Sequence, residues 1–127
     1  MEYLELKALT GGIPPRFRDL SRLFIYFNER AEMGTVREDS GAMLRAGIKT
    51  LVKCGACREE LWPYDIDKFA RKPAERCYQE AQGHVITSYQ RLSSLQEMKA
   101  CLAQGMPFVF GFSVYEHAMT RAVARTG

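Results

Sequence analysis

The sequence predicts an α+β domain in which helices occupy residues 1–83 and β structure follows over residues 84–127. Apolar residues recur at helical spacing in the first part, whereas β-branched and aromatic residues run together or alternate in the second. A chain of 127 residues has the length of one ordinary domain or of two small lobes packed together. Its hydrophobic content of 46% is sufficient for a buried core. We therefore expect a helical lobe followed by a partial β lobe.

The first expected helix covers residues 2–9, which are strong helix formers with apolar side chains on one face. Gly11 ends this helix, and the prolines that follow prevent it from resuming. The helix has no N-cap and no lead-in. We therefore expect that the sequence begins inside a longer protein.

A second helix is expected over residues 20–33, with Asp19 or Ser21 as its cap and Gly34 at its end. Its spacing predicts a buried stripe and a solvent-facing side. The stripe consists of Leu23, Phe24, Phe27 and Ala31. The side chains expected to face water are Arg22, Asn28 and Arg30.

The third helix is expected to begin after Asp39 or Ser40 and to end near Lys53, with Gly55 as its left-handed C-terminal residue. Gly47 in its middle lowers helix stability by roughly 1 kcal/mol relative to alanine. We expect that glycine stands here because the helix packs closely on another backbone. The residues expected on its buried face are Met43, Leu44, Gly47, Ile48, Leu51 and Val52. Those expected to face water are Arg45, Lys49 and Lys53.

Short helical pieces on the surface are expected over residues 66–71 and 74–82. Residues 85–89 are β-branched and aromatic and predict a strand. A helix over 95–103 follows, capped by Ser94 and stopped by Gly105. Residues 107–115 then predict a second strand, because three alternate aromatic residues fall on one face. These are Phe108, Phe110 and Phe112.

Charge and motifs exclude few function classes but favour none. The net charge of +3 is spread along the chain, so nothing indicates nucleic-acid binding. No apolar run has membrane-spanning length, and no signal sequence is visible, so free thiols in the cytoplasm are the default expectation. A zinc ribbon needs a second CxxC, and Cys77 and Cys101 are too far apart in sequence to supply one. No metal or cofactor is expected, and oligomeric state is left open.

Cys54-Gly55-Ala56-Cys57 is the one motif that could carry chemistry, and it matches part of the nucleophile signature of papain-like cysteine peptidases. We reject Cys57 as a nucleophile because Arg58 stands where an aromatic residue is required and no long apolar helix follows. A redox CxxC normally follows a strand and opens a helix, whereas this one closes a helix. Two thiols at a helix end is the favoured interpretation. His84 and His117 are interpreted as surface or capping residues.

The sequence as a whole nevertheless resembles the C1-type papain-like cysteine peptidases in their bacterial branch. The segment from Ser21 to Arg30 is similar to the one that follows their catalytic helix. The segment Asp39-Ser40-Gly41-Ala42 is similar to their glycine-rich substrate loop. Residues 46–55 and Glu60-Leu61-Trp62-Pro63-Tyr64 resemble the helix and Tyr-Pro-Tyr segment that follow. Residues 101–112 resemble a later helix, the Gly-Pro turn and a strand of the β-barrel in these peptidases. Residues 122–127 resemble the segment that leads to their catalytic histidine.

The resemblance implies an incomplete papain-like fold, with a helical lobe and part of a β-barrel lobe. It places the nucleophilic cysteine roughly ten residues upstream of Met1 and the base histidine beyond Gly127, so we expect no catalytic residue in this chain. It also implies that Ser40 and Gly41 line the substrate cleft, although Ser40 departs from the usual glycine. Met43 and Gly111 match positions around one substrate pocket. This pocket binds the side chain of the second residue before the cleaved peptide bond.

The expected function is therefore cysteine-type proteolysis in a complete protein, acting on a peptide or protein substrate, with no turnover by these residues alone. Two alternatives stay open. The chain could be a non-catalytic peptide-binding or relic module, or a thiol redox protein that uses Cys54 and Cys57. Cleavage specificity is not predicted by any of the motifs.

Overall fold

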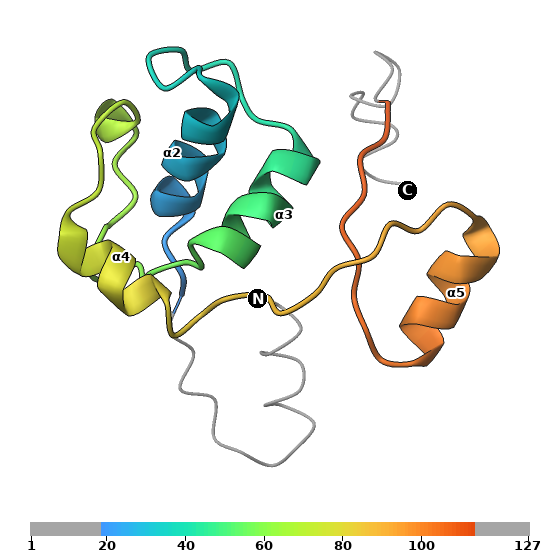
Figure 1. Ribbon diagram of the computed structural model, residues 1–127. Helices are drawn as coiled ribbons and strands as arrows, with labels where there is room; N and C mark the ends of the chain where they lie inside the picture. Colours follow the sequence, from blue (N-terminus) through green and yellow to red (C-terminus); the bar gives the residue numbers. More distant parts are fainter. Residues whose placement is uncertain (1–18, 114–127) are drawn as a thin grey trace, which may run out of the picture.

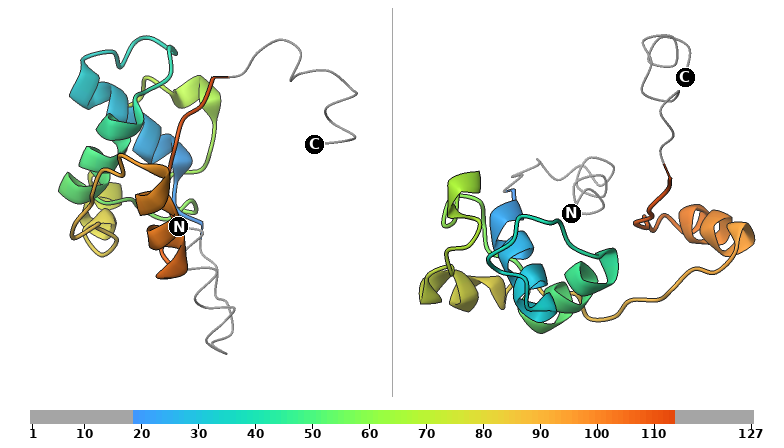
Figure 2. Two further views of the ribbon diagram at one scale, coloured as in Figure 1. Left: turned by 90° about the vertical axis from the view of Figure 1, so that its right-hand side faces the viewer. Right: turned by 90° about the horizontal axis from the view of Figure 1, so that it is seen from above.

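The computed structural model describes residues 19–113, and the expected helix over 2–9 lies outside this range. Figure 1 shows the described elements in the order α2 (Arg22–Met33), α3 (Leu44–Lys53), the 3-10 helix η1 (Ile66–Lys68), α4 (Glu75–Ala81) and α5 (Leu95–Ala103). Helices α2, α3 and α4 form one group, in which α2 packs against α3. An extended segment leads from α4 to α5, which lies apart from this group in the view from above in Figure 2.

Helix α2 ends as the sequence predicts and is capped by Ser21, one of the two expected caps, but it begins at Arg22 rather than at residue 20. The Ser21 hydroxyl accepts a hydrogen bond from Phe24 N at 3.1 Å, and Gly34 ends the helix with φ of 75°. The same hydroxyl donates to the Trp62 carbonyl at 2.6 Å. This cap therefore also fixes the start of α2 to a segment far along the chain.

The burial of α2 differs from the prediction at three positions. Asn28 and Arg30 were expected to face water but are 8% and 0% exposed, whereas Ala31 is exposed rather than buried. The reason is that the chain encloses a second side of α2. Asn28 Oδ1 accepts from the Tyr78 hydroxyl at 3.1 Å, and the Arg30 guanidinium donates to carbonyl groups of the following loop and of Phe69.

Helix α3 begins later than the sequence predicts, and of its expected buried face only Gly47 is fully buried, while Ile48 and Leu51 are half-buried. Met43 is its N-cap residue and gives no side-chain hydrogen bond, so neither Asp39 nor Ser40 caps it. The small residues Ala46, Gly47 and Thr50 are buried, while Leu44 is 50% exposed. Small side chains let α3 approach α2 closely, and the larger apolar residues Leu44 and Val52 stay exposed. The basic residues Arg45, Lys49 and Lys53 are exposed, as predicted.

Two glycines of this region have packing roles. A Cβ at Gly47 would collide with the Glu29 carboxylate, so the expected close contact exists, but it is with a side chain of α2 rather than with a backbone. Gly55 has φ of 71°, which confirms its expected left-handed conformation. A Cβ at Gly55 would collide with the Ala81 carbonyl oxygen at the end of α4.

The core joins α2, α4 and the loop after α3. It consists of Phe24, Cys57, Cys77 and Ala81, with Leu61, Trp62 and Tyr78 packed against it. The Phe24 and Tyr78 rings lie 5.0 Å apart in a tilted arrangement. Helix α4 was expected on the surface, but Cys77 and Ala81 are fully buried because their i, i+4 spacing gives this short helix one inward face.

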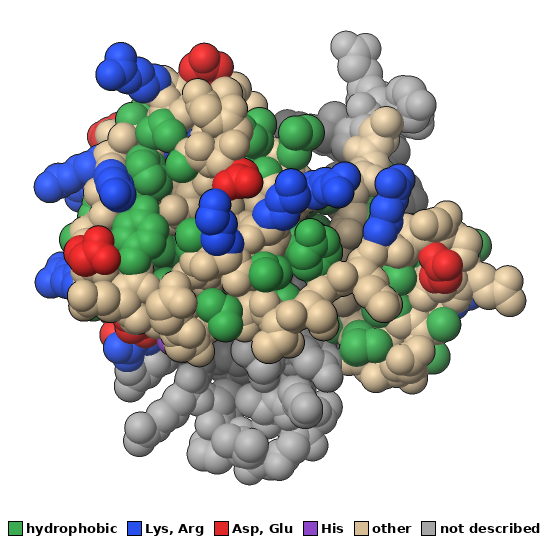
Figure 3. All heavy atoms as spheres, in the orientation of Figure 1, with side chains coloured by type: hydrophobic (Ala, Val, Ile, Leu, Met, Phe, Trp, Pro, Cys, Tyr) green, Lys and Arg blue, Asp and Glu red, His purple; other side chains and the backbone are tan. Residues whose placement is uncertain are grey.

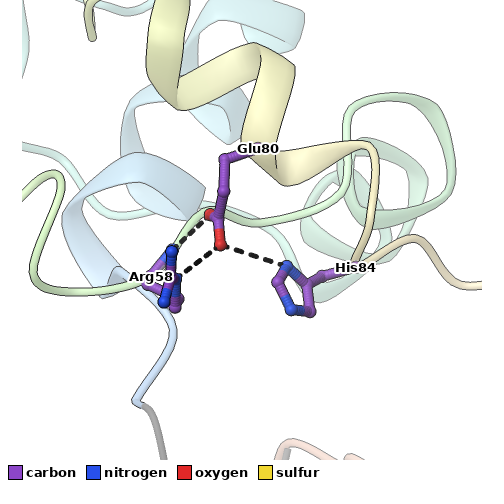
Figure 4. Close-up of polar contacts among 3 residues, drawn as sticks. All are labelled: Arg58, Glu80 and His84. Carbon is purple, nitrogen blue, oxygen red and sulfur yellow. Dashed lines mark hydrogen bonds and ion pairs between the residues drawn. The ribbon is translucent and has the colours of Figure 1, made fainter.

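The carboxylate of Glu80 holds the core segments together, as Figure 4 shows. It accepts from Arg58 N at 2.8 Å and from Arg58 Nε at 2.7 Å. His84 Nδ1 lies 3.8 Å from the same carboxylate. Arg58 also forms an isolated antiparallel bridge with Leu20, so this cluster links the start of α2, the loop after α3 and the end of α4.

The two expected strands are not formed within the described residues. Residues 85–89 and 107–113 are extended but have no ladder of strand hydrogen bonds. A strand needs a neighbour to pair its backbone groups, and among residues 19–113 these two segments do not pair. The aromatic alternation does hold, because the Phe108–Phe110 and Phe110–Phe112 ring centroids both lie 5.9 Å apart.

Helix α5 matches its prediction closely. The Ser94 side chain accepts from Glu97 N, and the Glu97 side chain accepts from Ser94 N, which completes a capping box. Gly105 follows the helix with φ of 72°. The division into lobes at residue 83 remains a prediction.

Candidate functional site

The connection from α2 to α3 carries three of the residues singled out in the sequence, Ser40, Gly41 and Met43. Ser40 and Gly41 are exposed, and Met43 is 64% exposed. Gly41 has φ of 78°, and a Cβ placed on it would meet nothing within 4 Å. The turn therefore presents bare backbone to solvent.

Tyr26 holds this turn from the side of α2. Its hydroxyl donates to Asp39 Oδ1 at 2.5 Å and accepts from Gly41 N at 3.1 Å. The hydrogen bond to Asp39 is the main cause that raises the pKa of Tyr26 above its ordinary value of 10.0. The phenol therefore stays protonated over the physiological range and keeps both hydrogen bonds.

Gly111 lies against the beginning of α3, far from it in sequence. A Cβ at Gly111 would be 3.9 Å from Leu44 Cδ1, which is ordinary van der Waals contact. Figure 1 shows the last part of the described chain passing beside the start of this helix. The fourth candidate residue is thus brought to the helix that follows the Ser40–Gly41 turn.

Large apolar side chains are exposed on both sides of this contact. On α3 and the residue before it they are Met43, Leu44 and Val52, and on the extended segment Val109, Phe110 and Phe112. In Figure 3, hydrophobic side chains lie beside a series of Lys and Arg side chains on this face. The surface thus offers apolar contact area next to positive charge.

Cys57 cannot serve as a nucleophile in this structure. It is fully buried, and burial together with the neighbouring Cys77 thiol raises the pKa of Cys57 to about 12. A reactive cysteine needs a lowered thiol pKa and access to its substrate. All cysteines of the described range are free thiols, and the neighbour that perturbs Cys57 is Cys77 rather than Cys54.

No family model matches the sequence. A curated protein of Acanthamoeba polyphaga mimivirus, named uncharacterized peptidase C1-like protein L477, is 42% identical over 116 residues. That alignment covers 84% of this chain and 37% of the viral protein. The solved structure of xylellain, a cysteine protease from Xylella fastidiosa, matches with a TM-score of 0.68 and 40% sequence identity.

Over most of its length, this chain is similar in sequence and in structure to papain-like cysteine peptidases. The match to xylellain covers 82% of this chain and 44% of xylellain, so the chain spans less than half the length of either relative. The expected papain-like α+β class is confirmed as a partial fold, because the described residues are mostly helical and carry little sheet.

Tyr26 and Arg30 support the candidate site, and the sequence analysis did not identify either of them. Arg30 lies over the Tyr26 ring with its guanidinium carbon 4.0 Å from the ring centroid. The signal available in the sequence is their i, i+4 spacing on α2, which places the two side chains on one face. Their contact with the turn depends on the path of residues 35–41, which no periodicity predicts.

In residues 19–113 no group of three or more His, Cys, Asp and Glu side chains is placed to hold a metal ion. No helix in that range is both long and apolar enough to cross a bilayer.

Proposed function

We propose that these residues form part of the substrate-binding wall of a papain-like cysteine peptidase, with a peptide or protein as substrate. The Ser40–Gly41 turn lies on one side of the wall and Gly111 on the other. The observation that supports this proposal is the position of Gly111, where an added Cβ would lie 3.9 Å from Leu44 Cδ1, since it brings the two candidate segments to the same end of α3.

Each candidate residue has a physical role in this proposal. Gly41 and Gly111 lack side chains, so an extended peptide can lie close to their backbones. The Ser40 hydroxyl is exposed and available as a hydrogen-bond partner. Met43 offers a polarisable, adaptable side chain to an apolar residue of the peptide.

We further propose that these 127 residues alone do not hydrolyse peptides. Peptide hydrolysis by a cysteine peptidase needs a thiolate paired with a histidine, and these groups act as a unit. Cys57 is buried with a raised thiol pKa, and His84 is directed toward Glu80. The nucleophile and base would then belong to other parts of a longer protein.

A non-catalytic peptide-binding module is the second candidate function. It is favoured by the same exposed turn and apolar residues, because binding needs no thiolate. The thiol redox alternative has weaker support, since the thiol interaction in the structure joins Cys57 to Cys77 in a fully buried core.

Binding of a fluorescein-labelled alanine hexapeptide with leucine at its third position, followed by fluorescence anisotropy, tests the proposed wall. We expect Gly41→Ala and Gly111→Val to weaken binding about tenfold or more. Gly34→Ala is the matched control, because Gly34 has φ of 75° and the same open surroundings as Gly41 but lies at the end of α2. Equal effects of Gly41→Ala and Gly34→Ala, or no binding by the unmodified chain, would refute the proposal.

Hydrolysis is tested separately with fluorescein-labelled casein in the presence of dithiothreitol. We expect no release of fluorescence above a buffer control. Thiol-dependent hydrolysis that disappears in Cys57→Ser would overturn the proposed lack of turnover.

A further inference from the structure

We propose that the outer surface of α3 is a docking site for an acidic, amphipathic helix of a partner protein. The basis of this inference is a pair of side-chain columns that run next to each other along α3, one apolar and one basic. The inference does not depend on the proposed peptidase function, because it uses neither the Ser40–Gly41 turn nor Gly111.

The two columns follow from the spacing of residues in α3. Apolar residues recur at every fourth position, and a basic residue follows each of them directly. Residues four apart lie above one another on a helix, so each set forms a column about 12 Å long. The apolar column is Leu44, Ile48 and Val52, and the basic column is Arg45, Lys49 and Lys53.

Both columns face outward. All three basic residues are exposed, and in the apolar column Leu44 is 50% exposed, Val52 is 37% exposed and Ile48 is half-buried. The remaining side of α3, which carries the small buried residues, packs inward. Figure 3 shows a series of Lys and Arg side chains beside hydrophobic side chains on this face. The surface therefore combines apolar contact area with positive charge.

The positive charge of this surface is mostly unopposed. Helix α3 contains no Asp or Glu. Lys53 forms an ion pair with Glu32 at 3.4 Å, and this pair is largely exposed. Within residues 19–113, Arg45 and Lys49 form no ion pair. Electrostatic complementarity therefore favours a partner that brings carboxylates to the basic column.

The two columns together favour a protein helix over a membrane or a nucleic acid. A partner helix with Glu at every fourth position and an adjacent apolar column can match both columns over the same length. A helix that lies in a bilayer surface inserts its apolar face by about 5–10 Å, whereas Ile48 is half-buried within the protein. Nucleic-acid phosphates would pair with the basic column and leave the apolar column without a contact.

Fluorescence anisotropy with a fluorescein-labelled peptide of Ala-Glu-Leu-Ala repeats tests the docking site. We expect binding that weakens about tenfold or more when Gln replaces every Glu of the peptide, and that also weakens as NaCl is raised. Arg45→Glu combined with Lys49→Glu should weaken binding by about tenfold or more. Arg76→Glu combined with Lys99→Glu is the matched control, because it changes the net charge equally at exposed positions of α4 and α5.

Two single substitutions test the apolar column and the ion pair. Val52→Ser should weaken binding about threefold, because it removes exposed apolar area from the column. Glu32→Ala should strengthen binding about twofold, because it frees Lys53 for the partner. An excess of the unlabelled leucine hexapeptide, which probes the substrate wall, should not displace the acidic peptide.

Absence of binding by the acidic peptide, or equal losses in the two double variants, would overturn the docking site. Displacement by the hexapeptide would refute it as well, since the acidic peptide would then occupy the substrate wall. Tighter binding to vesicles of phosphatidylcholine and phosphatidylserine, or to a random-sequence DNA duplex, at the same ionic strength would overturn the assignment to a protein helix. Circular dichroism checks that both double variants fold, and Arg45→Gln with Lys49→Gln replaces the charge reversal if it does not fold, with the same outcomes.

Discussion

Arg58 Nε lies 2.7 Å from Glu80 Oε1, although the two residues are 22 positions apart in sequence. Both side chains are less than a third exposed, and the same carboxylate also accepts from the Arg58 backbone. This ion pair connects α4 to the loop after α3, which contains Cys57. Its loss should therefore loosen the core rather than only the surface.

We expect Glu80→Ala to lower the free energy of unfolding by about 2 kcal/mol, because it removes charge-assisted hydrogen bonds and leaves Arg58 partly buried without its partner. Urea unfolding followed by the fluorescence of the single tryptophan measures this change. Glu32→Ala is the control, since its ion pair with Lys53 is largely exposed and should contribute at most about 0.5 kcal/mol. Comparable losses in the two variants would contradict the role of Glu80.

We expect Arg30→Lys to destabilise the protein by about 3 kcal/mol, since lysine cannot reproduce a planar set of donors among several carbonyl groups. Arg22→Lys is a suitable control, because Arg22 also lies over an aromatic ring, Tyr64, but is exposed. Chemical denaturation of both variants measures the difference. A loss below about 1 kcal/mol in Arg30→Lys would show that its carbonyl contacts are dispensable.

Gly55→Ala should lower the free energy of unfolding by about 3 kcal/mol or more, because the alanine would have a left-handed backbone and its Cβ would collide with the Ala81 carbonyl oxygen. Gly34→Ala has the backbone strain without the collision and should cost about 1 kcal/mol. The difference in their thermal midpoints, measured by circular dichroism, reports the packing contribution. Equal midpoints would mean that the end of α4 moves away at little cost.

Stability should fall with rising pH above about 9 because of Cys57. Its thiol pKa is raised from 9.0 to about 12 in the folded protein, so the unfolded chain releases this proton first. Between these values the unfolded state binds fewer protons, and the slope can reach about 1.4 kcal/mol per pH unit. Urea midpoints at several pH values check this, and Cys57→Ala should show a shallower decline. Identical slopes would exclude Cys57 as the source.

Local signals in the sequence predict the caps of α2 and α5, but neither the start of α3 nor the buried helix faces. Ser21 and Gly34 bound α2 because the capping hydrogen bonds themselves join neighbouring residues, and the Ser94 capping box is equally local. Arg30 was expected in water because its burial depends on where Phe69 and the following loop lie. The inward face of α3 was misplaced for a similar reason, since close approach to α2 favours small side chains over large ones.

The candidate site was only partly predictable. The resemblance led to Ser40, Gly41, Met43 and Gly111, and the structure brings Gly111 to the start of α3. Tyr26 could not be assigned from the sequence, because its hydrogen bonds to Asp39 and Gly41 depend on the shape of a loop. The expected strands also depend on partners, which the described residues do not supply.

The hydroxyl of Ser21 makes α2 dependent on parts of the chain that are synthesised later. It binds the carbonyl of Trp62, 41 residues downstream, while Ser21 N donates to the Cys57 carbonyl. Closing a loop of this length costs entropy that local helix formation does not recover. During translation, these two hydrogen bonds can form only after Cys57 and Trp62 have been synthesised, so the start of α2 gains its final contacts later than the helix itself.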